Sequence, residues 1–320
     1  MTYSQGLLSA SRTAIVDCMG LQPGERVAIV TDEPCRVIGK AMEQVVRELG
    51  NSVELIEIPP RRTHGEEPPP EVAALMLTMD VVLVPTSKSM THTNAKRNAQ
   101  AQGVRVATLP GVTEDMMVRC MNADYNKIAE LTNRLGDLME RTKTVRVTSP
   151  AGADLTMPIE GRKAFRSHGI FRKKGEGGNL PTGEAFVAPI EEHSQGIAVF
   201  DGSMAGIGIL TEPLRVHVRN GYAREIAGGA EAKRLIDLLA IHGQLSRNVA
   251  EFGIGTNEKA KITGVILEDE KVLGTVHVAF GDNISMGGSV NVQSHLDGLI
   301  KSPTVWFDEK MIMQNGKLLV

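Results

Sequence analysis

Short apolar runs alternate with amphipathic stretches in the first half of this chain of 320 residues, and this alternation restricts the folds that it can adopt. Four runs have the length and the Val, Ile and Leu content of buried strands: residues 26–30 (RVAIV), 52–58 (SVELIEI), 80–84 (DVVLV) and 104–109 (VRVATL). Three stretches between them have the apolar periodicity of helices: residues 37–49, 71–79 and 93–102. Strands that alternate with helices predict an open, mostly parallel α/β domain with helices on both faces of the sheet.

The pattern changes near residue 144. A longer amphipathic stretch, residues 123–142, predicts a helix that closes the first domain. Beyond it, short strand-like runs are joined by glycine turns, and a single helical stretch at residues 230–243 interrupts them. We therefore predict an α/β fold class with two domains: a Rossmann-like α/β domain over residues 1–143 and a β-rich α+β domain over residues 144–320.

The composition argues against several kinds of partner. A formal net charge of -3 gives no overall attraction to nucleic acid or to anionic lipid, and an aromatic content of 3% leaves few rings for base stacking. Cys18, Cys35 and Cys120 are odd in number and form no regular framework, which suits a reducing compartment. Since no run approaches the roughly 20 apolar residues of a membrane span, we expect a cytoplasmic protein that binds neither nucleic acid nor membrane.

Several common catalytic motifs are absent from the sequence. It has no GxGxxG after the first strand-like run, no Walker GxxxxGK[ST], no HExxH and no GxSxG. A dinucleotide enzyme, a P-loop NTPase, a zincin and a serine hydrolase are therefore disfavoured. The α/β half alone does not indicate a function.

Five possible metal ligands lie in apolar or glycine-rich surroundings in the second half. They are Glu184 (NLPTGEAFVAP), Glu251 (NVAEFGIGTN), His277 (GTVHVAFGDN), and His295 and Asp297 (SHLDG). Two imidazoles and three carboxylates suit divalent metals with mixed N and O ligation, such as Zn, Co, Mn or Fe(II). Three carboxylates favour two cations over one, because adjacent carboxylates without cations would repel one another and take up protons.

Each of these residues also has a purely structural interpretation. A single histidine in an apolar strand, such as His277, is more often a core residue, and Glu184 and Glu251 taken separately are more often turn carboxylates. The HxD pair is the stronger signal, since residues two apart in an extended chain project from the same face. Glu268, Asp269 and Glu270, shortly before His277, either form an acidic hairpin turn or orient a metal ligand. Spacing alone does not join the five positions into one site.

In this order, the segments NLPTGEAFVAP, AEFGIGTN, HVAFGDN and SHLDG resemble the metal-binding segments of the aminopeptidase T and aminopeptidase S family of metallopeptidases. Residues 86–116 also resemble the helix and strand that follow a THT segment in that family. The resemblance implies an N-terminal α/β domain, a C-terminal metal-binding catalytic domain with two divalent ions (Zn, Co or Mn), and a homodimer that encloses the active sites. It therefore predicts a hydrolase that cleaves N-terminal peptide bonds or related amide bonds.

The resemblance also implies a role for each ligand. Glu184, His277 and Asp297 would hold one metal, and His295 would belong to the second. Glu251 would bridge or contact the metals and act as the general base that accepts a proton from the attacking water.

One position departs from the peptidase pattern. The peptidases have a tyrosine a few residues after the histidine of the HxAxG segment, where this chain has Ile284. Two alternatives therefore stay open. The same fold family includes a dihydroxypyridine dioxygenase with a mononuclear Fe(II) site of two histidines and one carboxylate, which His277, His295 and Asp297 would be sufficient to form. The other alternative is a non-catalytic binding protein with a decayed site.

Overall fold

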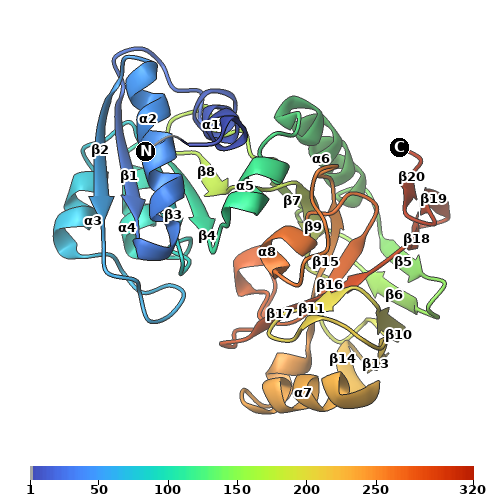
Figure 1. Ribbon diagram of the computed structural model, residues 1–320. Coiled ribbons are helices and arrows are strands. Elements are labelled where there is room, and N and C mark those ends of the chain that lie inside the picture. Colours follow the sequence, from blue (N-terminus) through green and yellow to red (C-terminus); the bar gives the residue numbers. More distant parts are fainter. Residues whose placement is uncertain (1–2) are drawn as a thin grey trace. The chain divides into compact units, whose positions relative to one another are not determined.

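The structure is a computed structural model that describes residues 3–320 (Figure 1). The described residues fall into two compact units, one of residues 3–129 and 167–182 and the other of residues 130–166 and 183–320. The sequence pattern placed a single boundary after residue 143. The chain instead returns to the first unit because β8 (Gly177–Asn179) pairs in parallel with β4 (Arg105–Pro110).

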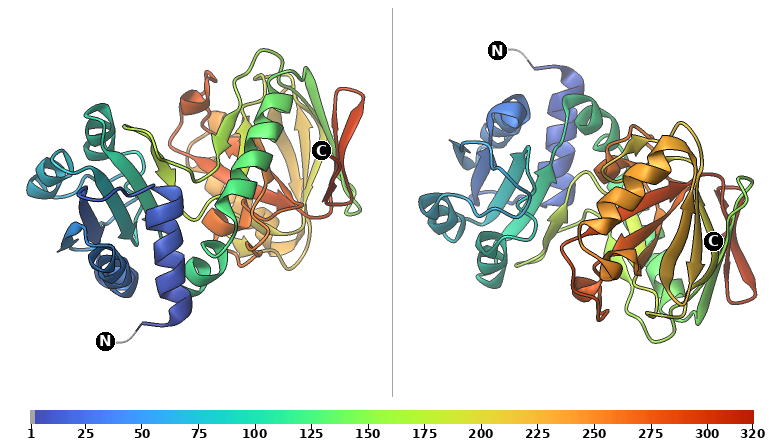
Figure 2. Two further views of the ribbon diagram at one scale, coloured as in Figure 1. Left: turned by 90° about the horizontal axis from the view of Figure 1, so that it is seen from above. Right: turned by 90° about the horizontal axis from the view of Figure 1, so that it is seen from below.

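The first unit is the open parallel α/β sheet that the sequence predicts. Its strand order is β2-β1-β3-β4-β8, and every pair of neighbours is parallel. The remaining strands are β1 (Arg26–Thr31), β2 (Ser52–Glu57) and β3 (Val81–Thr86). The helical elements are α1 (Gln5–Arg12), η1 (Thr13–Cys18), η2 (Glu33–Cys35), α2 (Arg36–Glu48), α3 (Pro70–Met76), α4 (Asn94–Ala101) and α5 (Glu114–Cys120). Figure 2 shows α1 and α2 on one face of this sheet and α3 and α4 on the other.

Local chemistry explains where the helices of this unit begin. The side chains of Thr93 and Thr113 accept hydrogen bonds from backbone N–H groups in the first turns of α4 and α5, as N-cap residues do. In α2, the residues Ile38, Met42 and Val45 recur on one face and are buried, which is the periodicity that predicts the helix.

The second unit is β-rich, as predicted, and contains two antiparallel sheets. The eight-stranded sheet has the order β14-β13-β10-β6-β5-β18-β19-β20, and the seven-stranded sheet has the order β12-β11-β17-β16-β15-β9-β7. The first sheet consists of β5 (Thr144–Thr148), β6 (Asp154–Pro158), β10 (Gln195–Phe200), β13 (Leu214–Arg219), β14 (Tyr222–Ala227), β18 (Thr304–Phe307), β19 (Lys310–Gln314) and β20 (Lys317–Leu318). The second consists of β7 (Phe165–Ser167), β9 (Glu184–Val187), β11 (Ser203–Met204), β12 (Gly208–Ile209), β15 (Val249–Gly255), β16 (Val276–Gly281) and β17 (His295–Ile300). The helical elements that begin in this part of the chain or run into it are α6 (Tyr125–Met139), α7 (Gly229–Ala240), η3 (Gln244–Arg247), α8 (Ile266–Asp269) and η4 (Ile284–Met286).

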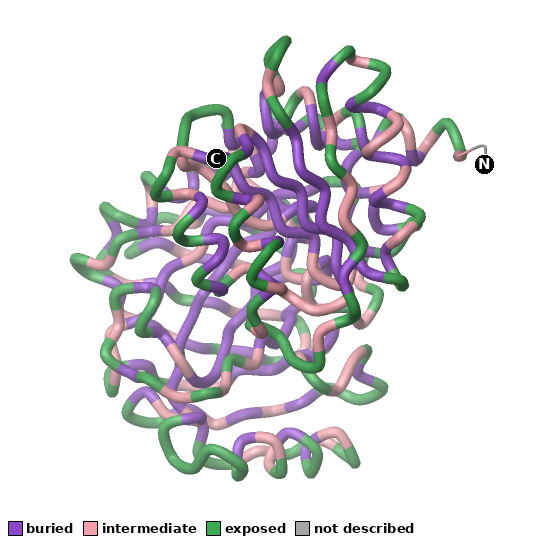
Figure 3. The backbone as a smooth tube through the Cα atoms, turned by 90° about the vertical axis from the view of Figure 1, so that its left-hand side faces the viewer, coloured by how far each residue is buried: buried purple, intermediate pink, exposed green. Residues whose placement is uncertain are grey.

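The core of the second unit lies between its two sheets. Phe200 on β10 meets Phe280 on β16 edge to face with ring centroids 5.8 Å apart, and Phe252 on β15 meets Phe307 on β18 in the same way at 6.4 Å. Side chains alternate along a strand, so the residues next to these phenylalanines in β15 and β16 point to the other face of the seven-stranded sheet. Figure 3 shows buried residues along the strands and exposed residues at the connections.

Among the described residues, none of the helices combines the length and the apolar character that crossing a membrane would need.

Candidate metal centre

Strand pairing brings the five candidate ligands to one face of the seven-stranded sheet. They lie on four consecutive strands in the order β17-β16-β15-β9, and this face is opposite to the core. Gly255 of β15 pairs with Glu184 of β9, and Gly253 pairs with His277 of β16. On the other side of β16, Gly281 pairs with His295, and Ala279 pairs with Asp297.

Glu251 lies between the two imidazoles. Its Oε1 is 3.1 Å from His277 Nε2, and its Oε2 is 3.3 Å from His295 Nε2. His295 Nε2 is also 3.5 Å from Asp297 Oδ1, as expected for residues two apart on one strand. On the other side, His277 Nε2 is 3.6 Å from Glu184 Oε2.

The ligand atoms therefore form two groups that share Glu251. One contains Glu184, Glu251 and His277, and the other contains Glu251, His295 and Asp297, with the ligand atoms of each group within 4.8 Å of one another. The family resemblance placed Asp297 with Glu184 and His277, whereas the structure groups it with His295. Neither group is the pair of histidines with one carboxylate that the dioxygenase alternative used.

The residues fit a divalent cation. Glu184, Glu251, His277 and Asp297 are buried, and Glu184 Oε2 and Asp297 Oδ1 accept no hydrogen bond. Buried carboxylate oxygens without partners are costly, and a cation would satisfy them. His295 Nδ1 is 2.8 Å from the Asp282 carbonyl oxygen, which accepts a hydrogen bond from Nδ1–H and leaves Nε2 to face the carboxylates.

A glycine makes room for the His277 ring. A Cβ built on Gly253 would overlap His277 Nε2, so only glycine at this position lets the imidazole lie across β15 and reach Glu251. Gly255 has a similar function for the backbone, because a Cβ there would overlap the carbonyl oxygen of Val272. The glycines of EFGIG, which the sequence pattern marked only as a turn, are therefore part of β15, the strand that carries Glu251.

Replacing Gly253 by Ala should displace the His277 ring and weaken metal binding while every ligand stays in the chain. We expect a loss of about 1–3 kcal/mol in the unfolding free energy, since overpacking a buried site has this cost. Chemical denaturation and a Co(II) titration measure the two effects. In a His277→Ala background the same substitution should have almost no further effect on stability, because the overlapping ring is gone. An equal loss in both backgrounds would show that the ring is not the cause.

Sequence reasoning missed a buried cation beside these ligands. Lys271 follows α8, its side chain is only 3% exposed, and its Nζ is 2.6 Å from Glu184 Oε1. It also donates a hydrogen bond to Glu270 Oε1. The available signal was a lysine in an acidic run (EDEK) six residues before His277.

The acidic run before His277 has several separate contacts. Asp269 accepts hydrogen bonds from the Ser203 hydroxyl and from the backbone N–H groups of Thr263 and Gly264. Glu268 accepts one from the Lys261 backbone N–H. The run is not a hairpin turn, because it lies at the end of α8. Glu270 is joined to the candidate ligand Glu184 through Lys271.

Without a metal ion, the carboxylates of the centre favour protonated imidazoles. Burial raises the pKa of Glu251, but hydrogen bonds with His277 and His295 more than offset this effect and hold it at about 2. Burial lowers the pKa of His277, yet Glu251 and Glu184 raise it to about 9. The pKa of His295 is likewise raised, because the effects of Asp297 and Glu251 exceed that of burial. Both imidazoles therefore carry a positive charge near neutral pH.

Metal binding should release protons and become stronger as the pH rises. An imidazole must be neutral to bind a metal, and in the metal-free protein Asp297 and Glu251 hold the pKa of His295 well above its usual value although burial lowers it. Below that pKa, the affinity falls about tenfold for each unit by which the pH decreases, for each proton that the metal displaces. Co(II) affinity should therefore rise from about pH 6 to about pH 8. Calorimetry in two buffers of different ionisation enthalpy counts the protons, and a His295→Gln variant should release one fewer. An affinity that is constant over this range would contradict the prediction.

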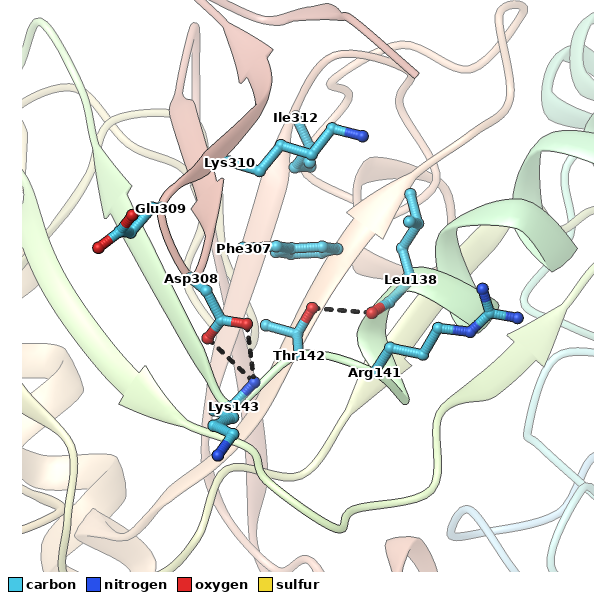
Figure 4. Close-up of a pocket in the computed structure, with 9 residues that line it drawn as sticks. All are labelled: Leu138, Arg141, Thr142, Lys143, Phe307, Asp308, Glu309, Lys310 and Ile312. Carbon is cyan, nitrogen blue, oxygen red and sulfur yellow. Dashed lines mark hydrogen bonds between the residues drawn. The ribbon is translucent and has the colours of Figure 1, made fainter.

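A surface pocket of the second unit contains none of the candidate ligands (Figure 4). Its polar groups stabilise local structure: Asp308 accepts hydrogen bonds from the backbone N–H groups of Lys143 and Thr144, and the Thr142 hydroxyl donates to the Leu138 carbonyl. It is lined by Leu138, Arg141, Thr142, Lys143, Phe307, Asp308, Glu309, Lys310 and Ile312. We assign no chemistry to it.

Comparison with known proteins points to one kind of enzyme. The family model for 2,5-dihydroxypyridine 5,6-dioxygenase matches residues 7–320. A 2,5-dihydroxypyridine 5,6-dioxygenase of Pseudomonas putida is 24% identical over 198 residues, an alignment that covers 57% of this chain and 56% of that protein. The chain thus spans a little over half the length of this curated relative.

Two solved structures have the same fold. The 2,5-dihydroxypyridine dioxygenase from Pseudomonas putida KT2440 matches with a TM-score of 0.83 and 17% identity over 100% of this chain and 99% of that one. Wild-type AmpT from Thermus thermophilus matches with a TM-score of 0.71 and 17% identity over 100% of both chains. The resemblance to aminopeptidase T is therefore confirmed for the fold.

The prediction of a metallo-aminopeptidase-like hydrolase is wrong. The family model and the curated relative both name a ring-cleaving dioxygenase, which was the stated alternative. The error arose because the peptidase and the dioxygenase share a fold, so the segments around the ligands do not separate the two chemistries. Ile284, which replaces the peptidase tyrosine, lies in η4 and is 48% exposed. The homodimer implied by the resemblance stays a prediction.

Proposed function

The chain belongs to the 2,5-dihydroxypyridine 5,6-dioxygenase family, and on this premise we propose that it is a metal-dependent dioxygenase that opens a dihydroxylated pyridine ring. The observation that carries the proposal is the family match over residues 7–320, and the buried cluster of carboxylates and imidazoles on the seven-stranded sheet supports it. In the proposed reaction, the C5–C6 bond of the ring breaks and both atoms of O2 enter the product.

We propose that Glu251, His295 and Asp297 hold one Fe(II) ion. Their ligand atoms form one group, and two carboxylates balance the charge of a divalent cation. Bound iron(II) supplies the one-electron chemistry that the reaction of an aromatic ring with O2 requires. This group differs from the pair of histidines with one carboxylate, because it has one histidine and two carboxylates. His277 Nε2 lies 3.1 Å from Glu251 and holds that carboxylate in place.

The side chains around this group suggest how substrate and water are handled. His295 has a side chain that is 32% exposed, whereas those of Glu251 and Asp297 are 9% and 10% exposed. We therefore place the substrate on the side of His295. The buried side chains exclude water from the opposite side, which strengthens the electrostatic interactions of the centre. A bound divalent cation would favour the ionised form of Glu251, so this residue would serve as a ligand and not as a proton donor.

The protein is first loaded with Fe(II) under anaerobic conditions. The test then measures its oxygen consumption after O2 and substrate are added. With 2,5-dihydroxypyridine we expect uptake of one O2 per ring, and mass spectrometry with labelled O2 should find two labelled oxygen atoms in the ring-opened product. Aminoacyl anilides serve as the control and should not be hydrolysed. No oxygen uptake with any of a panel of dihydroxypyridines would contradict the proposal.

A further inference from the structure

The geometry alone offers room for two metal ions. Each of the two ligand groups has three ligand atoms, and Glu251 presents one oxygen to each group. A carboxylate shared in this way is typical of dinuclear centres, in which two ions bind close together. Something else must decide whether the centre takes one ion or two.

The buried ammonium of Lys271 is the feature that favours one ion over two. Its Nζ donates to Glu184 Oε1 at 2.6 Å, and its side chain is 3% exposed. Glu184, which would be a ligand of the second ion, is therefore already paired with a cation that is covalently part of the chain. An ion bound to Glu184 would face the ammonium across the same carboxylate, where two like charges repel strongly because little water lies between them.

A single divalent ion supplies enough positive charge for this centre. Glu184, Glu251 and Asp297 can carry three negative charges, and the Lys271 ammonium and one divalent cation already supply three positive charges, before any proton on His277 is counted. A second divalent ion would leave uncompensated positive charge in a buried place, which is costly.

We infer that Lys271 takes the place of a second metal ion and restricts this centre to one divalent cation, held by Glu251, His295 and Asp297. The inference rests on the proposed function in one respect, namely that the centre binds a metal. Lys271 is a positioning residue: it holds Glu184 and does not touch the bound ion.

The number of ions per chain tests the inference without any measurement of activity. Wild-type protein loaded with excess Co(II) and freed of unbound ion should contain one ion per chain by elemental mass spectrometry. Lys271→Met, which keeps the length of the side chain but removes its charge, should contain two. Lys271→Arg keeps the charge and is the matched control, which should contain one. Two ions in the wild type, or one in Lys271→Met, would overturn the inference.

Two further variants keep the inference testable if Lys271→Met does not fold. Lys271→Met/Glu270→Gln removes one of the two carboxylates that Lys271 contacts, and it should also bind two ions. In the wild-type background, Glu184→Gln should still bind one ion, since the inference assigns Glu184 to Lys271 and not to the ion. Loss of the ion in Glu184→Gln would overturn the inference.

The outcomes separate the two claims. One ion in both the wild type and the Lys271 variants contradicts only the role of Lys271. No ion in the wild type at millimolar Co(II) contradicts the metal dependence in the proposed function and removes the inference with it. The absorption bands of bound Co(II) provide a second readout, because the second ion should add a new band in Lys271→Met that is absent from the wild type and from Lys271→Arg.

Discussion

Asp297→Asn should lower the affinity of the protein for its metal ion by more than about 100-fold, since even partners of metal ligands change affinity by about 10–100-fold. Asp297 Oδ1 is buried, accepts no hydrogen bond and lies 3.5 Å from His295 Nε2. An amide of the same shape has no charge to offer, so the group of Glu251, His295 and Asp297 would lose one of the two negative charges that balance a divalent cation. A competition titration of Co(II) against a chelator dye measures the dissociation constant.

The matched control is Asp201→Asn. Asp201 undergoes the same change of side chain, but its carboxylate accepts a hydrogen bond from the backbone N–H of Lys301 and belongs to neither ligand group. The metal affinity of this variant should equal that of the wild type. If Asp297→Asn also bound Co(II) like the wild type, the ion would have to lie in the other group, with Glu184, Glu251 and His277.

Much of the fold could be predicted from the sequence because its signals are local. The predicted strand at residues 104–109 corresponds to β4 (Arg105–Pro110), and the predicted helix at residues 37–49 corresponds to α2 (Arg36–Glu48). Both have a strong apolar pattern over their whole length. α1, α5 and β8 were missed, and β8 is the tripeptide GGN, which has no strand pattern of its own. β8 becomes a strand only by pairing with β4, and a pairing partner so distant in sequence is not a local property.

The candidate ligands could be named from the sequence, but their grouping could not. Glu251 and His277 come together because β15 and β16 pair with a particular register, in which an irregularity lies between Val249 and Glu251. A shift of one residue in a strand pair moves every side chain to the other face, so the grouping depends on this register. Lys271 is harder still to predict, because a lysine in an acidic run is usually solvated, whereas here its side chain is buried and its backbone packs against Gly255.

Lys271→Met should lower the unfolding free energy of the metal-free protein by about 3–5 kcal/mol, which is the usual effect of removing one partner of a buried ion pair. The ammonium is the hydrogen-bond partner of both Glu184 and Glu270, and all three side chains are shielded from water. Without it, two carboxyl groups must either stay charged in a buried place or take up protons.

The pH dependence of this loss gives the prediction a second test. Burial already raises the pKa of Glu184 and of Glu270, the latter to about 8, and both should rise further without the ammonium. A carboxyl group whose folded pKa is raised favours unfolding as the pH rises above its unfolded value, because the unfolded chain then loses protons that the folded chain keeps. The variant should therefore lose more stability at about pH 8 than at about pH 5.

Urea denaturation at both pH values measures this loss, with Lys261→Met as the control. Lys261 is an exposed lysine ten residues earlier in the chain, and its replacement should change the unfolding free energy by less than about 0.5 kcal/mol. Glu270→Gln in the Lys271→Met background should recover part of the loss, since it removes one of the two uncompensated carboxyl groups. Saturating Co(II) should recover more, because a second ion can then neutralise Glu184 and binds only the folded protein. Equal stability of Lys271→Met and the wild type at the higher pH would mean that the ammonium does not compensate these carboxylates.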